Sequence, residues 1–142
     1  MPSFRDLLVA ALTFSSFFIF NEPIKSQQKI IVTPLIKSTK GLSGKKISYP
    51  RGKQAELRLL KVNIPVGLST PIHIHPAPML VYVSQGKLKH VRGEVVNFFN
   101  KGDSFVESNK GSQHYVKSIG EKPAILFVGV SSVEGMPTTI NK

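Results

Sequence analysis

The 142-residue sequence contains no cysteine and no tryptophan, and it has few acidic residues. The lack of cysteine excludes disulfide bonds, thiolate catalysis and cysteine-based zinc sites. A metal ion would therefore have to be bound by histidine, carboxylate or backbone oxygen. Only 8 aspartate and glutamate residues stand against 19 lysine and arginine residues, so side chains for general acid–base catalysis are scarce.

The excess of basic residues gives a net charge of +11. Such a charge attracts anions, including small acids, anionic lipid and nucleic acid. No basic run is interleaved with aromatic residues, as a nucleic-acid-binding face usually is. The densest basic stretch, residues 37–53, is rich in glycine and serine, which is typical of an exposed loop. We therefore expect a solubilising surface, no nucleic-acid partner, and compatibility with an anionic small molecule.

An uncharged run of fourteen residues, 7–20, lies near the N-terminus. Its length suits the core of a signal peptide and is short for a transmembrane helix. Arg5 is offset by Asp6, and no A-x-A cleavage site follows; Ser26 is the best cleavage position. We expect residues 1–26 to be a signal peptide and the protein to be exported to the periplasm or another extracytoplasmic space. An uncleaved anchor, with membrane association through residues 7–20, and a buried helix are the alternatives.

The rest of the chain shows the pattern of a β protein. Short β-branched and apolar runs alternate with glycine, proline, asparagine and serine, and no helical stripe is present. This spacing indicates a sandwich or barrel, with residues 27–53 as an N-terminal arm and loop and residues 54–142 as the barrel. Strands are predicted at residues 30–32, 55–64, 71–75, 80–84, 87–92, 94–99, 103–107, 113–118 and 124–130.

Three of the four histidines are placed where strands could bring them together. His73 and His75 are two residues apart on a predicted strand, so they point to the same face. His114 follows a glycine turn at the start of another strand. The same spacing occurs on solvent-exposed faces that bind nothing, so it leaves both interpretations open. His90 lies in the middle of a strand, and we expect no second ligand near it.

The residues around these histidines form two spaced motifs. The first runs from Gly67 to Gly86 and is a glycine, five residues, His-x-His, three residues, Met79, six residues and a glycine. The second runs from Gly102 to Ser118 and contains His114. Together they resemble the motifs of the cupin superfamily, and in particular small single-domain exported cupins of unassigned activity.

The sequence departs from the cupin motifs at three positions. Met79 stands where the first motif has glutamate, and Ser108 and Ser118 replace a proline and an asparagine of the second. The second motif also carries one extra residue. A thioether is a poor ligand for Fe(II), Mn(II) or Zn(II) but acceptable to copper. Met79 therefore has three interpretations: an apolar wall beside a three-histidine site, a weak axial ligand, or the sign of a site that has lost its metal.

The resemblance implies an all-β fold, the cupin-type double-stranded β-helix or jelly-roll barrel, preceded by the N-terminal hydrophobic segment. It also implies that His73, His75 and His114 bind a divalent transition metal, without distinguishing Fe, Mn, Zn, Ni and Cu. Three neutral imidazoles leave positions open for water, dioxygen or an anionic substrate. Some three-histidine cupins are dioxygenases, so the resemblance implies a metal-dependent enzyme with dioxygenase-type chemistry as one option.

Two alternatives to an enzyme remain at this point. One is a non-enzymatic module that binds a small ligand or a metal, and the other is a structural barrel whose histidines are unused. Among the few acids, Glu107 is the better candidate for a general base. Strand alternation places Met79, Val81, Val83 and Val116 on the inner face, where they would line a small apolar pocket. The exposed edge strands of a small barrel lead us to expect a homodimer.

Overall fold

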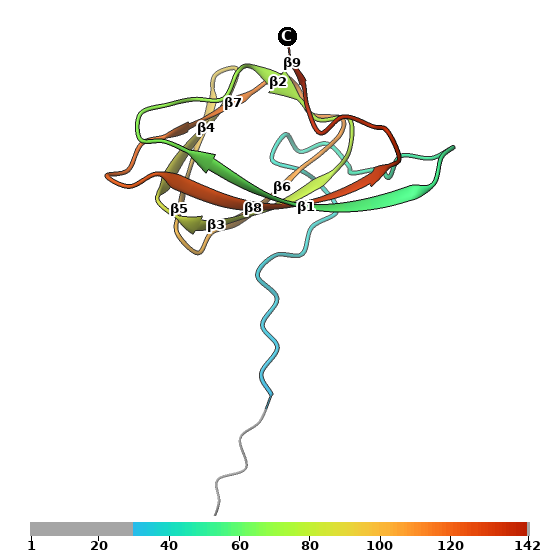
Figure 1. Cartoon of the computed structure of the whole chain (residues 1–142), viewed down its shortest axis with the longest axis horizontal. Coiled ribbons are helices and arrows are strands. Elements are labelled where there is room, and N and C mark those ends of the chain that lie inside the picture. The colour runs from blue at the N-terminus through green and yellow to red at the C-terminus, as the bar shows by residue number, and fades with distance from the viewer. Residues whose placement is uncertain (1–29, 142) are drawn as a thin grey trace, which may run out of the picture. The chain divides into compact units, whose positions relative to one another are not determined.

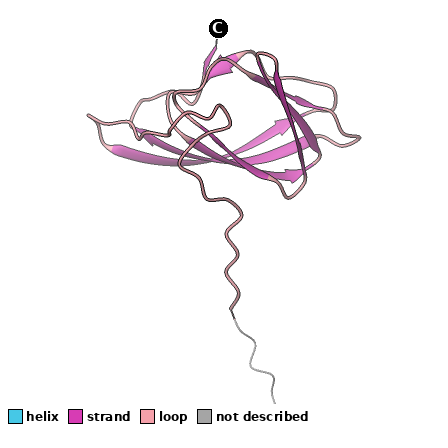
Figure 2. Ribbon diagram, turned by 180° about the vertical axis from the view of Figure 1, so that it is seen from behind, coloured by secondary structure: helices cyan, strands magenta, loops and turns pink. Residues whose placement is uncertain are grey.

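The computed structural model describes residues 30–141, and residues Thr33–Lys142 form one compact unit (Figure 1). The described residues form strands, turns and loops and no helix (Figure 2). Within them, no helix is long and apolar enough to cross a membrane. The predicted signal peptide or anchor, residues 1–26, lies outside the described residues.

The described part of the chain contains nine strands. Two long strands, β1 and β8, pair in antiparallel register over their whole length, from Ala55 opposite Val133 to Ile64 opposite Ala124. The strands are β1 (Ala55–Ile64), β2 (His73–Ile74), β3 (Met79–Gln85), β4 (Lys87–Arg92), β5 (Val95–Asn100), β6 (Ser104–Glu107), β7 (Tyr115–Ser118), β8 (Ala124–Val133) and β9 (Ile140–Asn141).

Two antiparallel sheets enclose the core. One has the strand order β1-β8-β3-β6 and the other β5-β4-β7, while β2 and β9 form a short separate pair (Figure 1). Both larger sheets contribute to one apolar cluster because their strands alternate between buried and exposed residues. The buried members of this cluster are Ile64, Ala77, Met79, Val81, Val83, Leu88, Phe105, Val116, Ala124, Leu126, Val128 and Val130.

The segment before β1 covers the free edge of β6. The backbone N–H of Leu42 donates to the Val106 carbonyl at 2.9 Å, and the Leu42 side chain packs against the core. A Cβ on Gly41 would lie 2.4 Å from the Ser108 nitrogen, so this close approach requires glycine. Part of the predicted N-terminal arm, at residues 41 and 42, thus packs against the barrel.

The strand predictions agree closely with the structure from residue 55 to residue 130. The predicted bounds of β1 and β4 match in full, and β8 continues three residues further, to Val133. The predicted strand at residues 30–32 is wrong, because these residues have high β propensity but pair with no described strand. Strand β9 was missed, since two residues carry no detectable alternation.

Candidate metal centre

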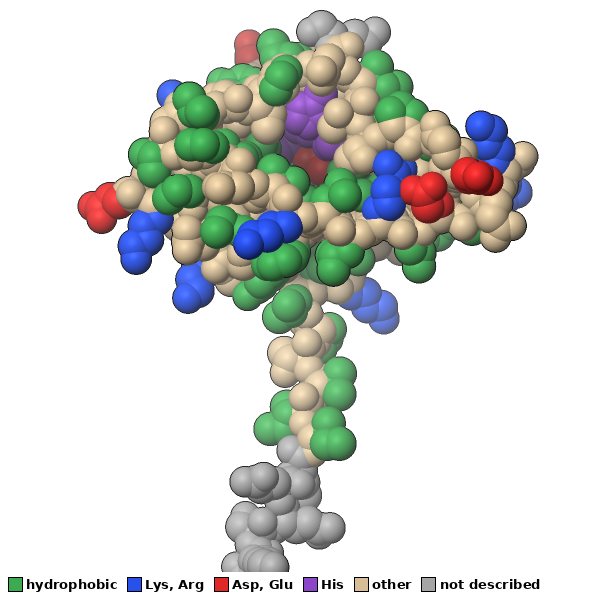
Figure 3. Space-filling model, viewed as in Figure 1, with side chains coloured by type: hydrophobic (Ala, Val, Ile, Leu, Met, Phe, Trp, Pro, Cys, Tyr) green, Lys and Arg blue, Asp and Glu red, His purple; other side chains and the backbone are tan. Residues whose placement is uncertain are grey.

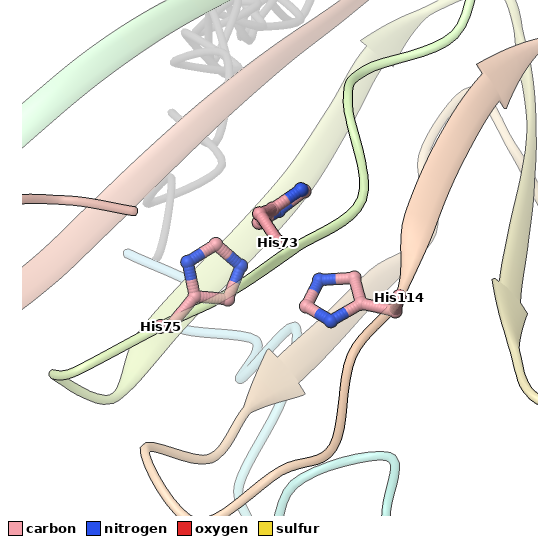
Figure 4. A group of neighbouring side chains, drawn as sticks. All are labelled: His73, His75 and His114. Atoms are coloured by element: carbon pink, nitrogen blue, oxygen red, sulfur yellow. The ribbon is translucent and has the colours of Figure 1, made fainter. Parts of the chain in front are cut away.

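Backbone pairing brings His73 and His114 together. The N–H of His73 donates to the His114 carbonyl at 2.9 Å, and the N–H of His114 donates to the His73 carbonyl at 3.0 Å. His73 begins β2, and His114 comes directly before β7. His75 follows β2 on the same segment, and the three rings lie close together (Figure 4). Two short strand ends from distant parts of the sequence thus form one cluster.

The three imidazoles have the spacing of ligands around one ion. Their ring centroids are 4.4 Å apart for His73 and His114, 4.7 Å for His73 and His75, and 4.9 Å for His75 and His114. One ring nitrogen from each histidine lies within 4.8 Å of those of the other two. The group can therefore hold a metal ion, and its donor set suits a divalent transition metal.

Each of the three rings is oriented by a backbone carbonyl. Nδ1 of His73 lies 2.8 Å from the Pro71 oxygen, that of His75 lies 3.1 Å from the Thr138 oxygen, and that of His114 lies 3.3 Å from the Ser112 oxygen. A carbonyl can only accept, so Nδ1 carries the proton in each ring. The Nε2 lone pairs are then the ones available to a metal, an arrangement common among metal-binding histidines.

Burial keeps two of these histidines neutral. It lowers the pKa of His114 to about 3. Burial also lowers the pKa of His75 below its ordinary value, although the hydrogen bond to the Thr138 carbonyl opposes that shift. A neutral imidazole is the form that binds metal, so protons do not compete for these two ligands at neutral pH.

The three histidines line a cavity of about 210 Å³. Histidine side chains are visible at the bottom of a hollow on one face of the molecule (Figure 3). Of the four residues predicted to line a pocket, Met79, Val81 and Val116 line this cavity, whereas Val83 is fully buried in the core and does not. The other apolar residues of the lining are Leu60, Val62, Pro71, Phe105, Leu126 and Val128.

Glu107 also lines the cavity and sits at the centre of a buried polar network. Its Oε1 accepts a hydrogen bond from Nε2 of His90 at 2.6 Å and lies 3.8 Å from Nε2 of His114. Its Oε2 forms an ion pair with Arg92. Arg92 also donates to the Ser112 carbonyl, the group that orients His114. Both carboxylate oxygens of Glu107 therefore have a protein partner, His90 for Oε1 and Arg92 for Oε2.

The expectation that His90 has no second ligand near it is wrong. His90 is fully buried, its ring stacks on that of His114 at 4.8 Å, and it forms a second potential metal-binding group with Glu107 and His114. Alternation along β4 could have revealed this, because Leu88, His90 and Arg92 share the inward face. A histidine and an arginine beside a core leucine indicate a buried partner of opposite charge.

Burial by itself would raise the pKa of Glu107. The hydrogen bond from His90 and the positive charge of Arg92 are among the contacts that outweigh this effect, so the pKa of Glu107 lies below its ordinary value. The carboxylate is therefore ionised at neutral pH and is a weak base. Together with the hydrogen bond from His90, Arg92, which was not predicted, stabilises a full negative charge at this depth.

The C-terminal segment completes the site in a way that the motifs did not reveal. Arg58, on β1, donates to the Thr138 hydroxyl at 2.8 Å, the Ser132 hydroxyl at 2.7 Å and the Met136 carbonyl at 2.8 Å. The bonds to Thr138 and Met136 fix the loop whose Thr138 carbonyl orients His75. Thr138, Thr139 and Asn141 also line the cavity. The sequence alone gave no periodic pattern that would attach this segment to the histidines.

A family model described as "Cupin domain" matches residues 60–130, half of the sequence. The chain belongs to the cupin family. This confirms the resemblance and the all-β jelly-roll fold. A comparison with curated proteins finds no match.

Solved structures with the same fold include two enzymes by name. The DMSP lyase DddQ from Ruegeria pomeroyi is 21% identical with a TM-score of 0.52, over 61% of this chain and 43% of that one. The polyketide cyclase RemF from Streptomyces resistomycificus is 17% identical with a TM-score of 0.51, over 81% of this chain and 85% of that one. The cupin domain of Cnp3 from Schizosaccharomyces pombe is 18% identical with a TM-score of 0.50, over 61% and 59%. The chain thus spans less than two thirds of DddQ and of the Cnp3 domain, and these likenesses show the fold alone.

Proposed function

We propose that this cupin binds one divalent transition metal ion through His73, His75 and His114 and acts on a small molecule at the open coordination positions. The observation that carries this proposal is the set of three Nδ1 hydrogen bonds to backbone carbonyls. They leave three Nε2 lone pairs for a shared ion. A barrel that needs only a packed core does not require three neighbouring imidazoles to be oriented in this way, whereas a metal site does.

The cavity favours a small ligand with one polar end. Its volume of about 210 Å³ would hold roughly seven water molecules. Apolar residues from both sheets form most of its exposed surface, and the polar residues Thr70, Thr139 and Asn141 also reach it. A small, anionic molecule would place its charged group at the ion and its apolar part against the aliphatic wall.

The bound ion would supply Lewis acidity or the activation of dioxygen, so we propose dioxygenase-type chemistry as the enzymatic function. The lyase and cyclase names of two structural neighbours support an enzymatic function in general and identify no reaction for this chain. The protein's own contribution would be to hold the ligand against the apolar wall and to exclude water from the ion.

A non-enzymatic metal- or ligand-binding module is the second candidate, and one observation favours it. Among the described residues that line the cavity, Glu107 is the only acid, and both of its oxygens are already paired. Its lowered pKa makes it a weak base. Reactions that need a free acid or base in the cavity therefore lack one, whereas metal binding and dioxygen chemistry do not require it.

Metal analysis of protein purified without an affinity tag tests the site. We expect close to one equivalent of a transition metal, and the double variant His73→Gln/His114→Gln should lose it while remaining folded. Less than about a tenth of an equivalent after reconstitution contradicts the proposal. Oxygen consumption over a panel of small acids then separates the candidates: turnover supports the enzyme, and a silent panel with stoichiometric metal supports the binding module.

We also propose that the protein is exported. The uncharged run at residues 7–20 and the cleavage position after Ser26 support this proposal. Mass spectrometry of protein from its native cells should find a chain that begins at Gln27. An intact N-terminus in a membrane fraction would instead support an anchor, and an intact N-terminus in the cytoplasm would contradict export.

A further inference from the structure

An ion bound only by His73, His75 and His114 would keep its full double positive charge. The three imidazoles are neutral ligands, and most of the exposed surface of the cavity wall is apolar. A charge in such surroundings is costly unless an opposite charge lies near it. This inference rests on the proposed metal site, and it concerns which residue supplies that opposite charge.

Glu107 is placed to do so. An ion bound at Nε2 of His114 with an ordinary bond of about 2.1 Å would lie no more than about 6 Å from Oε1 of Glu107, because the two protein atoms are 3.8 Å apart. The attraction between opposite charges at that distance, away from bulk water, is many times the thermal energy. Glu107 is also the only acidic residue among the described residues that line the cavity.

The carboxylate of Glu107 faces the cavity, while its cationic partner Arg92 lies outside the cavity lining. Arg92 pairs with Oε2 and is not among the residues lining the cavity, whereas Glu107 is. The side chain of Arg92 also donates to the Ser112 carbonyl, so its position is fixed. The guanidinium therefore binds the carboxylate without entering the cavity, and His90 holds Oε1 next to His114.

The position of Glu107 in the sheet is equally informative. Glu107 on β6 lies directly opposite Met79 on β3. Both side chains are buried and both line the cavity. Residues paired in this way have Cβ atoms about 4.5–5.5 Å apart. A carboxylate at either position would therefore reach the same region, and Met79, which cannot carry charge, occupies one of the two.

We propose that Glu107 supplies the negative charge of the metal site from strand β6, opposite Met79. It acts as a positioning and charge-compensating residue: its carboxylate lowers the energy of the bound ion, and through Arg92 it braces the Ser112 carbonyl that orients His114. The expected consequence is that metal affinity depends on Glu107 even though His73, His75 and His114 donate the nitrogen ligands.

The test compares metal affinity in matched variants of the full chain, with Zn(II) and Co(II) as probes in competition with a chelator of known affinity. Glu107→Gln keeps the size of the side chain and removes its charge. We expect its affinity to fall at least tenfold, while Glu94→Gln, which removes an exposed acid, changes it less than twofold. Equal affinity in the Glu107→Gln variant and the parent protein overturns the proposal.

A second variant distinguishes the effect of the negative charge of Glu107 from its structural support of Arg92 and His90. Adding Met79→Glu to the Glu107→Gln variant returns a carboxylate to the facing position, and we expect it to restore at least half of the lost binding energy as judged from the fold-change. A folded double variant with no recovery shows that Glu107 only braces Arg92 and His90, and it overturns the proposal. Failure of the parent protein to bind either metal would instead refute the proposed function.

A measurement on the unaltered protein keeps the proposal testable if Glu107→Gln does not fold. The infrared difference spectrum on Zn(II) addition should show a shifted carboxylate band, because Glu107 is the only acid among the described cavity residues. Binding of one equivalent without a carboxylate signal overturns the proposal.

Discussion

His73 and His114 are directly opposite each other and are joined by two backbone hydrogen bonds of 2.9 and 3.0 Å. The pairing uses backbone atoms only, so it does not depend on the imidazoles. We therefore expect His73→Ala to remove stoichiometric metal while leaving the barrel intact. Metal analysis and circular dichroism check this expectation. Loss of the β-sheet signal in the variant would show that the ring itself supports the fold.

The stability of the metal-free protein should fall in acid. The pKa of His114 is about 3 in the folded state and about 6.5 in the unfolded chain. Between these values the unfolded state binds the additional proton, so the free energy of unfolding decreases as pH falls. From pH 6.5 to 4.5 this amounts to about 2–3 kcal/mol for one group. The lowered pKa of His75 acts in the same direction, as does that of Glu107 below its ordinary value.

Urea unfolding of the metal-free protein at several pH values measures this effect. We expect a plateau above pH 6.5 and a decline below it. The variant His114→Gln, which removes the titrating ring, should show a shallower decline than the parent. Equal slopes for the two proteins would contradict the assignment to His114.

Arg58 should control metal affinity from outside the cavity. Arg58→Ala removes two hydrogen bonds to the segment that carries Thr138 and one to Ser132 on β8, and so loosens the carbonyl that orients His75. We expect metal affinity to fall about tenfold, within the range for loss of an orienting group, and stability to fall by about 1–3 kcal/mol. Arg51→Ala, at an exposed loop position, is the control. Unchanged affinity in Arg58→Ala would show that His75 needs no support from this segment.

We propose that the protein forms a homodimer through the β1 edge of its sheet. β1 ends the strand order, and Leu57 and Leu59 on it are 84% and 75% exposed. Leu80 and Phe127 add to the same apolar surface, which favours association. Light scattering should give a dimer mass, and Leu57→Lys with Leu59→Lys should give a monomer. A monomer mass for the parent protein contradicts the proposal.

The sequence predicted the barrel well because its signals are local. Alternation in β1 and β4 and the glycine-containing breaks define strands without reference to the rest of the chain. The motif spacing also brought His73, His75 and His114 together correctly. Among the predicted strands, the one at residues 30–32 was wrong, because high β propensity does not by itself provide a neighbouring strand to pair with.

What the sequence could not reveal are contacts made by single residues across long distances. His90, Arg92 and Glu107 come from two strands that belong to different sheets, and nothing in their spacing indicates that they meet. The same is true of Arg58 and Thr138, which are eighty residues apart. Val83 shows a different limitation of the sequence. Strand alternation correctly placed its side chain on the inner face, but alternation does not distinguish a residue of the packed core from one that lines the cavity.

The pairing of β1 with β8 and of His75 with Thr138 sets an order for the protein's assembly. A chain that is being synthesised exposes β1 first, yet β1 has no partner until residues 124–133 have left the ribosome. The carbonyl that orients His75 comes later still. The three-histidine group therefore lacks this support until residue 138 has been synthesised, and an ion that reaches a shorter nascent chain finds His73 and His75 but no finished site. Metal loading would in consequence follow the synthesis of residues 124–138.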